Sequence, residues 1–197
     1  MTNNPTETSQ GKQTDAAAAG LSVLPNGYQT ARLSVTPWRA VLRDDRRLQA
    51  LEEALSVMLT EPVLRHLPER VHLPKGPDAI KAWIAQRDQS AALYLVEADT
   101  GLAGLMFLFR PVDAPTDGPM HLGYLFGEDS WGKGFASEMA CGLVEALATG
   151  PKFTLQGGVD VANPASARVL EKAGLEIDEA QSNDETSVFL RQVGGRN

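Results

Sequence analysis

The stretch from Gly123 to Glu138, GYLFGEDSWGKGFASE, joins an apolar run, a loop rich in glycine and the first turn of a helix. Small residues stand at Gly132, Gly134 and Ala136, just where a helical pattern begins. The first N–H groups of a helix have no partner within it, and the helix dipole adds about half a positive charge there. The loop therefore predicts a site for a phosphate or pyrophosphate group, to which Lys133 would add a cation.

This loop matches neither standard phosphate-binding motif, and glycine before a helix also occurs in plain turns. A second segment strengthens the signal. Phe153 to Val161 (FTLQGGVDV) predicts a strand, and Ala165 to Gly174 (ASARVLEKAG) predicts a short helix. Asn163 suits the cap of this helix, Pro164 its first position and Gly174 the position after its end.

Together these stretches resemble the GNAT superfamily of acyl-CoA-dependent N-acyltransferases, most closely the branch of the ribosomal-protein N-terminal acetyltransferases. Four motifs carry the resemblance in the order and spacing of that branch. They are GY at Gly123-Tyr124, WGKGFASE at Trp131 to Glu138, VDVAN at Val159 to Asn163, and SARVLEKAGL at Ser166 to Leu175. The resemblance implies an α+β fold: a central twisted mixed β-sheet, flanked by helices on both faces, with splayed central strands.

Periodicity outside the motifs predicts elements that suit this fold. Helical patterns cover Asp44 to Thr60 and Pro77 to Gln89, and another helix is expected from Phe135 to about Thr149. Strands are expected at Tyr28–Thr36, Ala92–Ala98, Leu102–Phe109, His121–Phe126, Glu176–Ala180 and Ser187–Gln192.

Composition is that of an ordinary globular protein, with 43% hydrophobic residues and a net charge of -7 over 197 residues. We expect a mobile tail at residues 1–24 and a single acyltransferase domain at residues 25–197. No segment is apolar for long enough to cross a bilayer and no signal peptide is evident, which predicts a cytoplasmic protein that does not bind membranes. The acidic balance argues against general nucleic-acid binding.

The lone cysteine, Cys141, excludes an internal disulfide and a cysteine-based zinc site. Its place in an apolar helical pattern predicts a buried, inert thiol. His66 and His72 lie in a proline-rich segment that forms part of the acceptor wall in enzymes that the chain resembles. They are either loop histidines or acceptor-binding residues, and no cysteine or carboxylate cluster beside them predicts a metal site.

The resemblance also assigns the cofactor site, with acetyl-CoA as the acyl donor. In that fold the pantetheine arm lies between the splayed strands, and the pyrophosphate rests on N–H groups of the glycine loop. The backbone of Leu125 or Phe126 would then polarise the thioester carbonyl. The implied cofactor-binding residues are Leu125, Phe126, Trp131, Gly132, Lys133, Gly134, Phe135, Ala136, Ser137, Asn163 and Ser166.

Ser166 is the candidate to donate a proton to the departing thiolate, because the branch places a serine there. Many other GNAT enzymes use a tyrosine farther along the same helix, and that position is Leu170 here. Two other readings stay open. Ser166 can instead satisfy a backbone donor at the start of the helix, and Asn163 can cap the helix, contact the pantetheine, or do both.

The general base is less well defined by the sequence. Relatives often carry a glutamate on the strand before Asn163, but Gln156-Gly157-Gly158 stands there in this chain. Glu128, Asp160 and His121 remain as candidates, and we name a water relayed by Glu128 or His121 as the base. The sequence leaves open that neither residue is essential.

These assignments predict an N-acetyltransferase that moves an acetyl group from acetyl-CoA directly to a primary amine. The amine belongs to a protein N-terminus or to a small molecule. The alternative is a non-catalytic acyl-CoA-binding or sensing domain, which Gly158 and the missing tyrosine favour. A phosphate-binding module of another kind is a third reading, which the segment from Asn163 to Gly174 argues against. Homodimers are common among enzymes of this shape.

Overall fold

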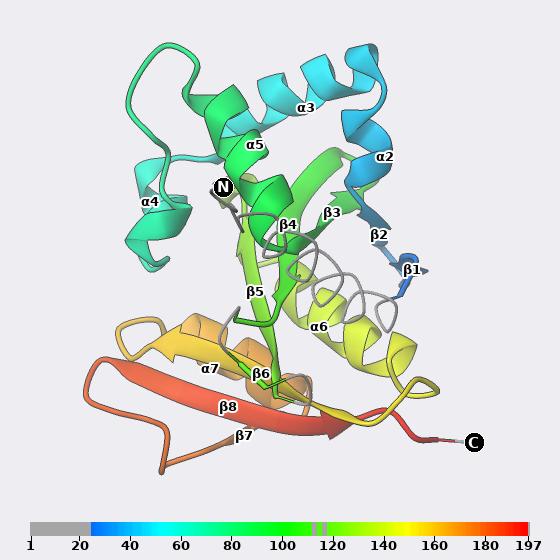
Figure 1. Ribbon diagram of the computed structural model, residues 1–197, viewed down its shortest axis with the longest axis vertical. Coiled ribbons are helices and arrows are strands. Elements are labelled where there is room, and N and C mark those ends of the chain that lie inside the picture. The colour runs from blue at the N-terminus through cyan, green and yellow to red at the C-terminus, as the bar shows by residue number, and fades with distance from the viewer. Residues whose placement is uncertain (1–24, 112–113, 116–117, 197) are drawn as a thin grey trace, which may run out of the picture.

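The computed structural model describes residues 25–111, 114–115 and 118–196 (Figure 1). The predicted tail at residues 1–24 lies outside the described residues. Within them, strands form one sheet in the order β1-β2-β3-β4-β5-β6-β8-β7. The strands are β1 (Tyr28–Gln29), β2 (Ser34–Pro37), β3 (Ala92–Ala98), β4 (Gly101–Phe109), β5 (Met120–Phe126), β6 (Phe153–Asp160), β7 (Glu176–Ile177) and β8 (Thr186–Val193).

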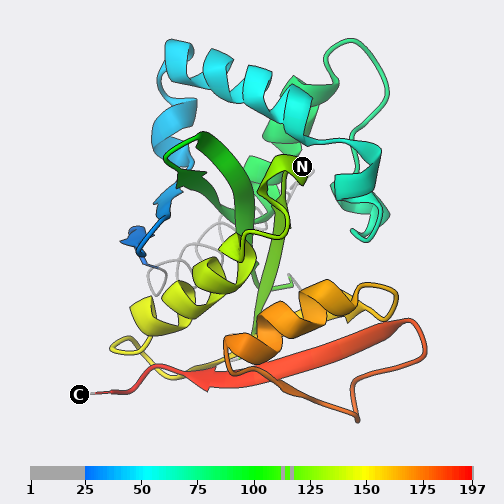
Figure 2. The same ribbon diagram turned by 180° about the vertical axis from the view of Figure 1, so that it is seen from behind.

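Helices cover both faces of this sheet, as the sequence predicts. Helix α5 lies in front of the sheet in Figure 1, whereas α6 and α7 lie in front of it in Figure 2, which shows the other side. The helices are α2 (Arg39–Leu42), α3 (Asp45–Met58), α4 (Glu61–Leu64), α5 (Ala79–Ser90), α6 (Phe135–Ala146) and α7 (Pro164–Lys172), with 3₁₀ turns η1 (Glu69–Val71) and η2 (Glu128–Ser130). The α+β class and the mixed sheet are confirmed.

Two hydrophobic clusters fill the two faces. One joins Leu51 of α3 and Trp83 of α5 to alternate residues of β3, β4 and β5, including Leu125. The other joins Met139 of α6 and Leu170 of α7 to the intervening residues of the same strands and to β6. Because successive side chains of a strand point to opposite faces, each strand contributes to both clusters.

The feature that matters most for function is the pairing of β5 with β6. These strands are parallel, and they pair only at Met120 with Leu155 and at His121 with Gln156. Beyond that point β6 pairs with β8 and β5 pairs with β4. The unpaired stretch, 122–126 of β5 opposite 157–160 of β6, is called the β5–β6 splay below. Figure 1 shows β5 upright and β6 crossing its lower end, so the predicted splay of the central strands is confirmed.

Helix ends follow the capping residues that the sequence offers. The side chain of Asp44 accepts hydrogen bonds from the N–H groups of Arg46 and Arg47 at the start of α3. Asn163 caps α7, and Gly174 follows its end with a φ of 74°. The predicted start and end of α7 are therefore confirmed.

Two sequence predictions need correction. The strand expected at Tyr28–Thr36 is two short strands, β1 and β2, which pair antiparallel with Tyr28 opposite Val35. Cys141 is exposed rather than buried, because the buried side of α6 carries Met139, Ala140 and Leu143 instead.

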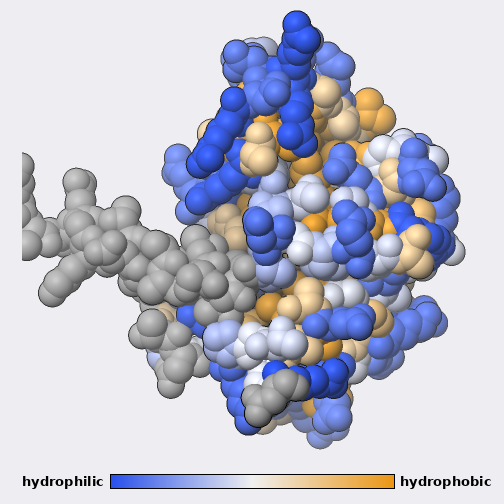
Figure 3. Space-filling model, turned by 90° about the vertical axis from the view of Figure 1, so that its right-hand side faces the viewer, coloured by the Kyte–Doolittle hydropathy of each residue, from blue (hydrophilic) through white to orange (hydrophobic). Residues whose placement is uncertain are grey.

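The surface in Figure 3 carries hydrophilic residues over much of the upper part, with hydrophobic ones interspersed among them. No helix within the described ranges is long and apolar enough to cross a membrane.

Gly104 of β4 permits the close approach of β5 at the splay. It lies opposite Phe126, and a Cβ there would overlap the Leu125 carbonyl oxygen and come within 2.8 Å of the Phe126 ring. We expect Gly104→Ala to lower the free energy of unfolding by about 1–3 kcal/mol, because β5 must shift. Urea unfolding measures this.

Gly158→Ala is the matched control, because a Cβ there meets only the Thr186 methyl group, at 3.6 Å. That contact is ordinary, so the control should leave stability unchanged or slightly raise it. Equal stability of the two variants would contradict the close packing of β5 on β4.

Candidate active site

The glycine loop leads from β5 through η2 into α6. Gly132 and Gly134 have φ values of 73° and 78°, a conformation that residues with a Cβ rarely adopt. Gly134 occupies the N-cap position of α6, and no side chain caps the helix. The N–H groups of Phe135, Ala136 and Ser137 therefore lack the side-chain acceptor that usually covers a helix start. A Cβ at Gly132 would meet no atom within 4 Å, so the loop has open space beside it. These features fit a pyrophosphate group.

Arg32 braces this loop, and sequence reasoning gave it no role. Its guanidinium forms an ion pair with Glu138 of α6, 2.6 Å between Nη2 and Oε2, and donates to the Lys133 carbonyl oxygen at 3.0 Å. It also lies 4.8 Å from the centre of the Phe135 ring. Nothing in the local sequence indicates that Arg32 meets a loop about a hundred residues away.

The indole of Trp131 is half exposed, and its Nε1–H donates to the Phe126 carbonyl oxygen at 2.7 Å. Trp131 thus ties the loop to the end of β5.

Backbone direction distinguishes the two candidate donors on β5. Gly127, the residue after β5, donates its N–H to the carbonyl oxygen of Ala103 in β4. Since backbone groups alternate along an antiparallel pair, Leu125 N–H also faces β4 and Phe126 N–H faces away from it. The Phe126 amide is therefore the one directed towards the β5–β6 splay.

Asn163 and Ser166 meet at the start of α7, where Asn163 Oδ1 accepts from Ser166 N–H at 3.1 Å. The Ser166 hydroxyl donates to the Tyr124 hydroxyl at 3.1 Å, which in turn donates to the Ser166 carbonyl oxygen at 3.2 Å. Tyr124 belongs to β5 and α7 follows β6, so this pair spans the splay. Burial raises the pKa of Tyr124 to about 12, against a smaller opposing effect of the Ser166 hydrogen bond. Tyr124 therefore stays protonated in neutral solution.

Sequence reasoning quoted Tyr124 within its motif but assigned it no function. The available signal was its spacing: Tyr124 is two residues from both Leu122 and Phe126, which places all three on the face that carries α7.

The other two predicted catalytic residues lie apart from Ser166. His121 sits where β5 and β6 still pair, and its ring stacks on Phe109 at 5.1 Å between centroids. Burial lowers the pKa of His121, and the nearby charge of Arg70 lowers it further. Glu128 lies beyond the opposite end of β5, where its Oε1 accepts from the Thr60 hydroxyl at 2.6 Å. The structure therefore does not bring His121 and Glu128 together.

A different acidic residue contacts the proline-rich segment that carries His66. Asp160 at the end of β6 lies with Oδ2 2.9 Å from Nδ1 of His66, and its Oδ1 accepts from Ala162 N–H at 2.8 Å. The hydrogen bond from His66, then that from Ala162, hold the pKa of Asp160 below its usual value. His72 instead bonds to the Leu67 carbonyl oxygen in its own segment, at 2.9 Å from Nε2. Among the described residues no three His, Cys, Asp or Glu side chains form a metal-binding group.

A family model described as an acetyltransferase (GNAT) domain matches residues 39–176. This match covers most of the chain, from the first residue of α2 to the first residue of β7. The chain therefore belongs to the GNAT acetyltransferase family.

Solved structures share this fold at low sequence identity. A GCN5-related N-acetyltransferase from Brucella melitensis is 17% identical with a TM-score of 0.63, and 84% of this chain and 77% of that one align. RimL, a ribosomal alpha-N-protein acetyltransferase in complex with coenzyme A, is 15% identical with a TM-score of 0.59, over 83% and 96% of the chains. MccE, a microcin self-immunity acetyltransferase in complex with acetyl-CoA and AMP, is 14% identical with a TM-score of 0.57, over 88% and 99%. No curated protein sequence gave a significant match.

The Arg32–Glu138 network should make stability depend on pH in the acid range. Burial disfavours the charged carboxyl, but hydrogen bonds from Thr30 and Arg32 outweigh it and lower the pKa of Glu138. An unfolded glutamate has a pKa of about 4.3, so the network is fully stabilising above that value and is lost as the pH falls through the lower folded-state pKa.

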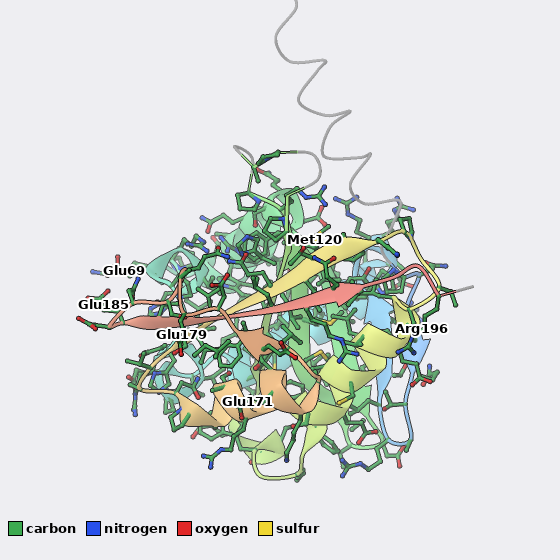
Figure 4. All side chains as sticks on the ribbon, turned by 90° about the horizontal axis from the view of Figure 1, so that it is seen from below. Glu69, Met120, Glu171, Glu179, Glu185 and Arg196 are labelled. Atoms are coloured by element: carbon green, nitrogen blue, oxygen red, sulfur yellow. The ribbon has the colours of Figure 1, made fainter. Side chains whose placement is uncertain are left out.

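We therefore expect Glu138→Gln to be less stable than the wild type at neutral pH and so to melt at a lower temperature. The loss in the free energy of unfolding should be about 1 kcal/mol or less, as is usual for an ion pair at the surface. The difference should shrink as the pH falls towards about 3. Glu171→Gln is the control, since Glu171 has no ion pair within the described part of the chain (Figure 4). A melting difference for Glu138→Gln that is constant with pH would contradict the network.

Proposed function

We propose that this acetyltransferase moves the acetyl group of acetyl-CoA directly to a primary amine, carried by a protein N-terminus or a small molecule. As a GNAT acetyltransferase, the chain uses acetyl-CoA as its acyl-donor cosubstrate. The observation that carries the proposal is the β5–β6 splay, which lies beside the uncapped start of α6. This combination offers unpaired backbone donors for an extended arm and N–H groups for a pyrophosphate.

Two groups at the splay suit acyl transfer. Acetyl-CoA supplies a thioester carbon that a neutral amine can attack. The Phe126 N–H would stabilise the oxyanion that develops during attack, a term usually worth several kcal/mol. The hydroxyls of Tyr124 and Ser166 form one hydrogen-bonded pair, whose protons can turn towards the departing thiolate. This reading deepens the prediction for Ser166 by adding Tyr124 as its partner.

A non-catalytic acyl-CoA-binding or sensing domain remains the second candidate. It is favoured by Gly158, which leaves β6 without the glutamate that the resemblance leads one to expect. Binding without thiol release separates this candidate from the enzyme.

Binding of acetyl-CoA should depend on Gly134. A glutamate there strains the backbone, whose φ is 78°, and brings a negative charge to the start of α6. We expect Gly134→Glu to abolish binding in calorimetric titration and to abolish thiol release with any amine that the wild type acetylates. Gly101→Glu is the matched control, because Gly101 also has a positive φ and open space but lies in the β3–β4 turn.

Binding by Gly134→Glu as tight as by Gly101→Glu would contradict the assignment of the cofactor loop. Binding by the wild type without thiol release from a broad panel of amines would favour the sensing domain.

Tyr124→Phe removes the hydroxyl that joins Ser166. We expect kcat to fall roughly 10- to 100-fold with little change in the KM for acetyl-CoA, because thiolate departure loses its proton source. Tyr94→Phe is the control: burial also raises the pKa of Tyr94 to about 12, but its hydroxyl donates to the Pro25 carbonyl oxygen away from the splay. Equal kcat for the two variants, measured by thiol release, would argue against this proton source.

A further inference from the structure

We propose that His66, held by Asp160, is the base that takes the proton from the acceptor amine. This inference rests on the proposed function, and it deepens that function by assigning the acceptor side of the site. His66 follows α4 and Asp160 ends β6, so their 2.9 Å contact joins the proline-rich segment after α4 to the edge of the β5–β6 splay.

The position of Asp160 along β6 supports this role. His121 pairs with Gln156, and Leu125 and Asp160 each lie four residues farther along their strands. Leu125 and Asp160 therefore lie on the two strands that diverge beyond this pairing, and the His66–Asp160 pair stands at the end of the β6 side of the splay. His121, by contrast, is at the closed end of the splay.

The two proton-transfer groups lie on opposite faces of the sheet. Val159 of β6 packs with α6 and α7, so the next residue, Asp160, points to the opposite face, where α3 and α5 pack. Tyr124 of β5 packs on the face of α6 and α7. An amine that arrives from the side of His66 therefore attacks a thioester whose sulfur can leave towards Tyr124.

The hydrogen bond fixes the form of the imidazole. An ionised carboxylate only accepts hydrogen bonds, so Nδ1 of His66 carries the proton that faces Asp160, and a neutral ring then has its lone pair on Nε2. Nε2 makes no hydrogen bond within the part of the chain that the structure describes, and one third of the His66 side chain is exposed. Asp160 is in turn oriented by Ala162 N–H, which makes it a positioning residue.

Gly158 leaves room for an acceptor beside this pair. It lies on the same face of β6 as Asp160, is exposed, and a Cβ there would meet only the Thr186 methyl group within 4 Å. The position that lacks a carboxylate in the sequence thus lies two residues before Asp160, whose partner His66 comes from elsewhere in the chain.

The transfer balances with these groups. An N–C bond forms between the amine and the acetyl carbon, and the C–S bond breaks with its electron pair going to sulfur. The amine proton passes to Nε2 of His66, and the thiolate takes a proton from the Tyr124–Ser166 pair. Solvent then takes the extra proton from His66 and returns a proton to the Tyr124–Ser166 pair. The products are an amide and a free thiol.

Charged groups stand on several elements at the end of the molecule that carries the His66–Asp160 pair. Glu69 of η1 and Glu185 before β8 lie at the same end of the molecule in Figure 4. The charged groups on the elements around His66 are Asp160 of β6, Glu61 and Arg65 of its own segment, Glu69 and Arg70 of η1, Glu128 after β5, and Asp184 and Glu185 before β8.

The tautomer of His66 can be measured without a substrate. Long-range proton–nitrogen NMR of the full chain at about pH 8.5, where an ordinary imidazole is neutral, reports which ring nitrogen carries the proton. We expect the Nδ1–H form in the wild type and the Nε2–H form in Asp160→Asn, because the amide NH₂ of asparagine would donate to Nδ1. His66→Gln assigns the signal. An Nε2–H form in the wild type, or no change in Asp160→Asn, overturns the proposal.

Kinetics then test the base with an amine that the wild type acetylates. We expect His66→Gln to lower kcat/KM roughly 100-fold and to remove the acid limb of its pH profile, while the Kd for acetyl-CoA is unchanged. His72→Gln, a histidine bonded within the same segment, should behave as the wild type.

An active wild type with an equally active His66→Gln overturns the base and leaves the proposed function standing. A wild type that binds acetyl-CoA but acetylates no amine overturns the proposed function, and with it the role of His66, whatever the tautomer.

Discussion

The parallel pairing of β5 with β6 ends after two residues on each strand, and the rest of the site depends on that limit. A continuous sheet would satisfy the facing N–H and C=O groups of both strands, whereas here each strand is held only by its outer neighbour. The backbone groups of 122–126 and 157–160 that face the splay can thus bind a ligand without loss of any pairing between strands. Gly104 on one side, where β4 and β5 approach closely, and β8 on the other keep the two strands apart.

The splay also separates the two faces on which chemistry is assigned. Tyr124 and Ser166 meet under α7, while His66 and Asp160 meet on the side of α3 and α5. Direct acyl transfer needs a proton removed from the amine and one supplied to the thiolate, and separate groups are assigned to these two roles here. Because strand side chains alternate, a single opening in the sheet can present a different group to each end of the reaction.

Local sequence predicted the elements well, because strong periodicity and caps decide them. Asp44, Asn163 and Gly174 mark helix ends by their own chemistry. In the glycine loop, Gly132 and Gly134 indicated where the backbone takes a positive φ. The site was predicted less completely, since it is made by contacts between distant segments. Arg32 meets Glu138, and His66 meets Asp160, only because the sheet order brings those segments together. Burial of Cys141 was predicted wrongly, because a helical pattern rich in apolar residues does not fix which side faces the core.

The most direct test of the central claim is a crystal structure of the chain with coenzyme A bound. We expect the pyrophosphate on the N–H groups of Phe135 to Ser137 and the pantetheine arm between β5 and β6. Its thiol should lie near the Tyr124 hydroxyl and within reach of the Phe126 amide. Coenzyme A bound outside the splay would contradict this expectation. So would β5 and β6 paired along their full length with no ligand between them.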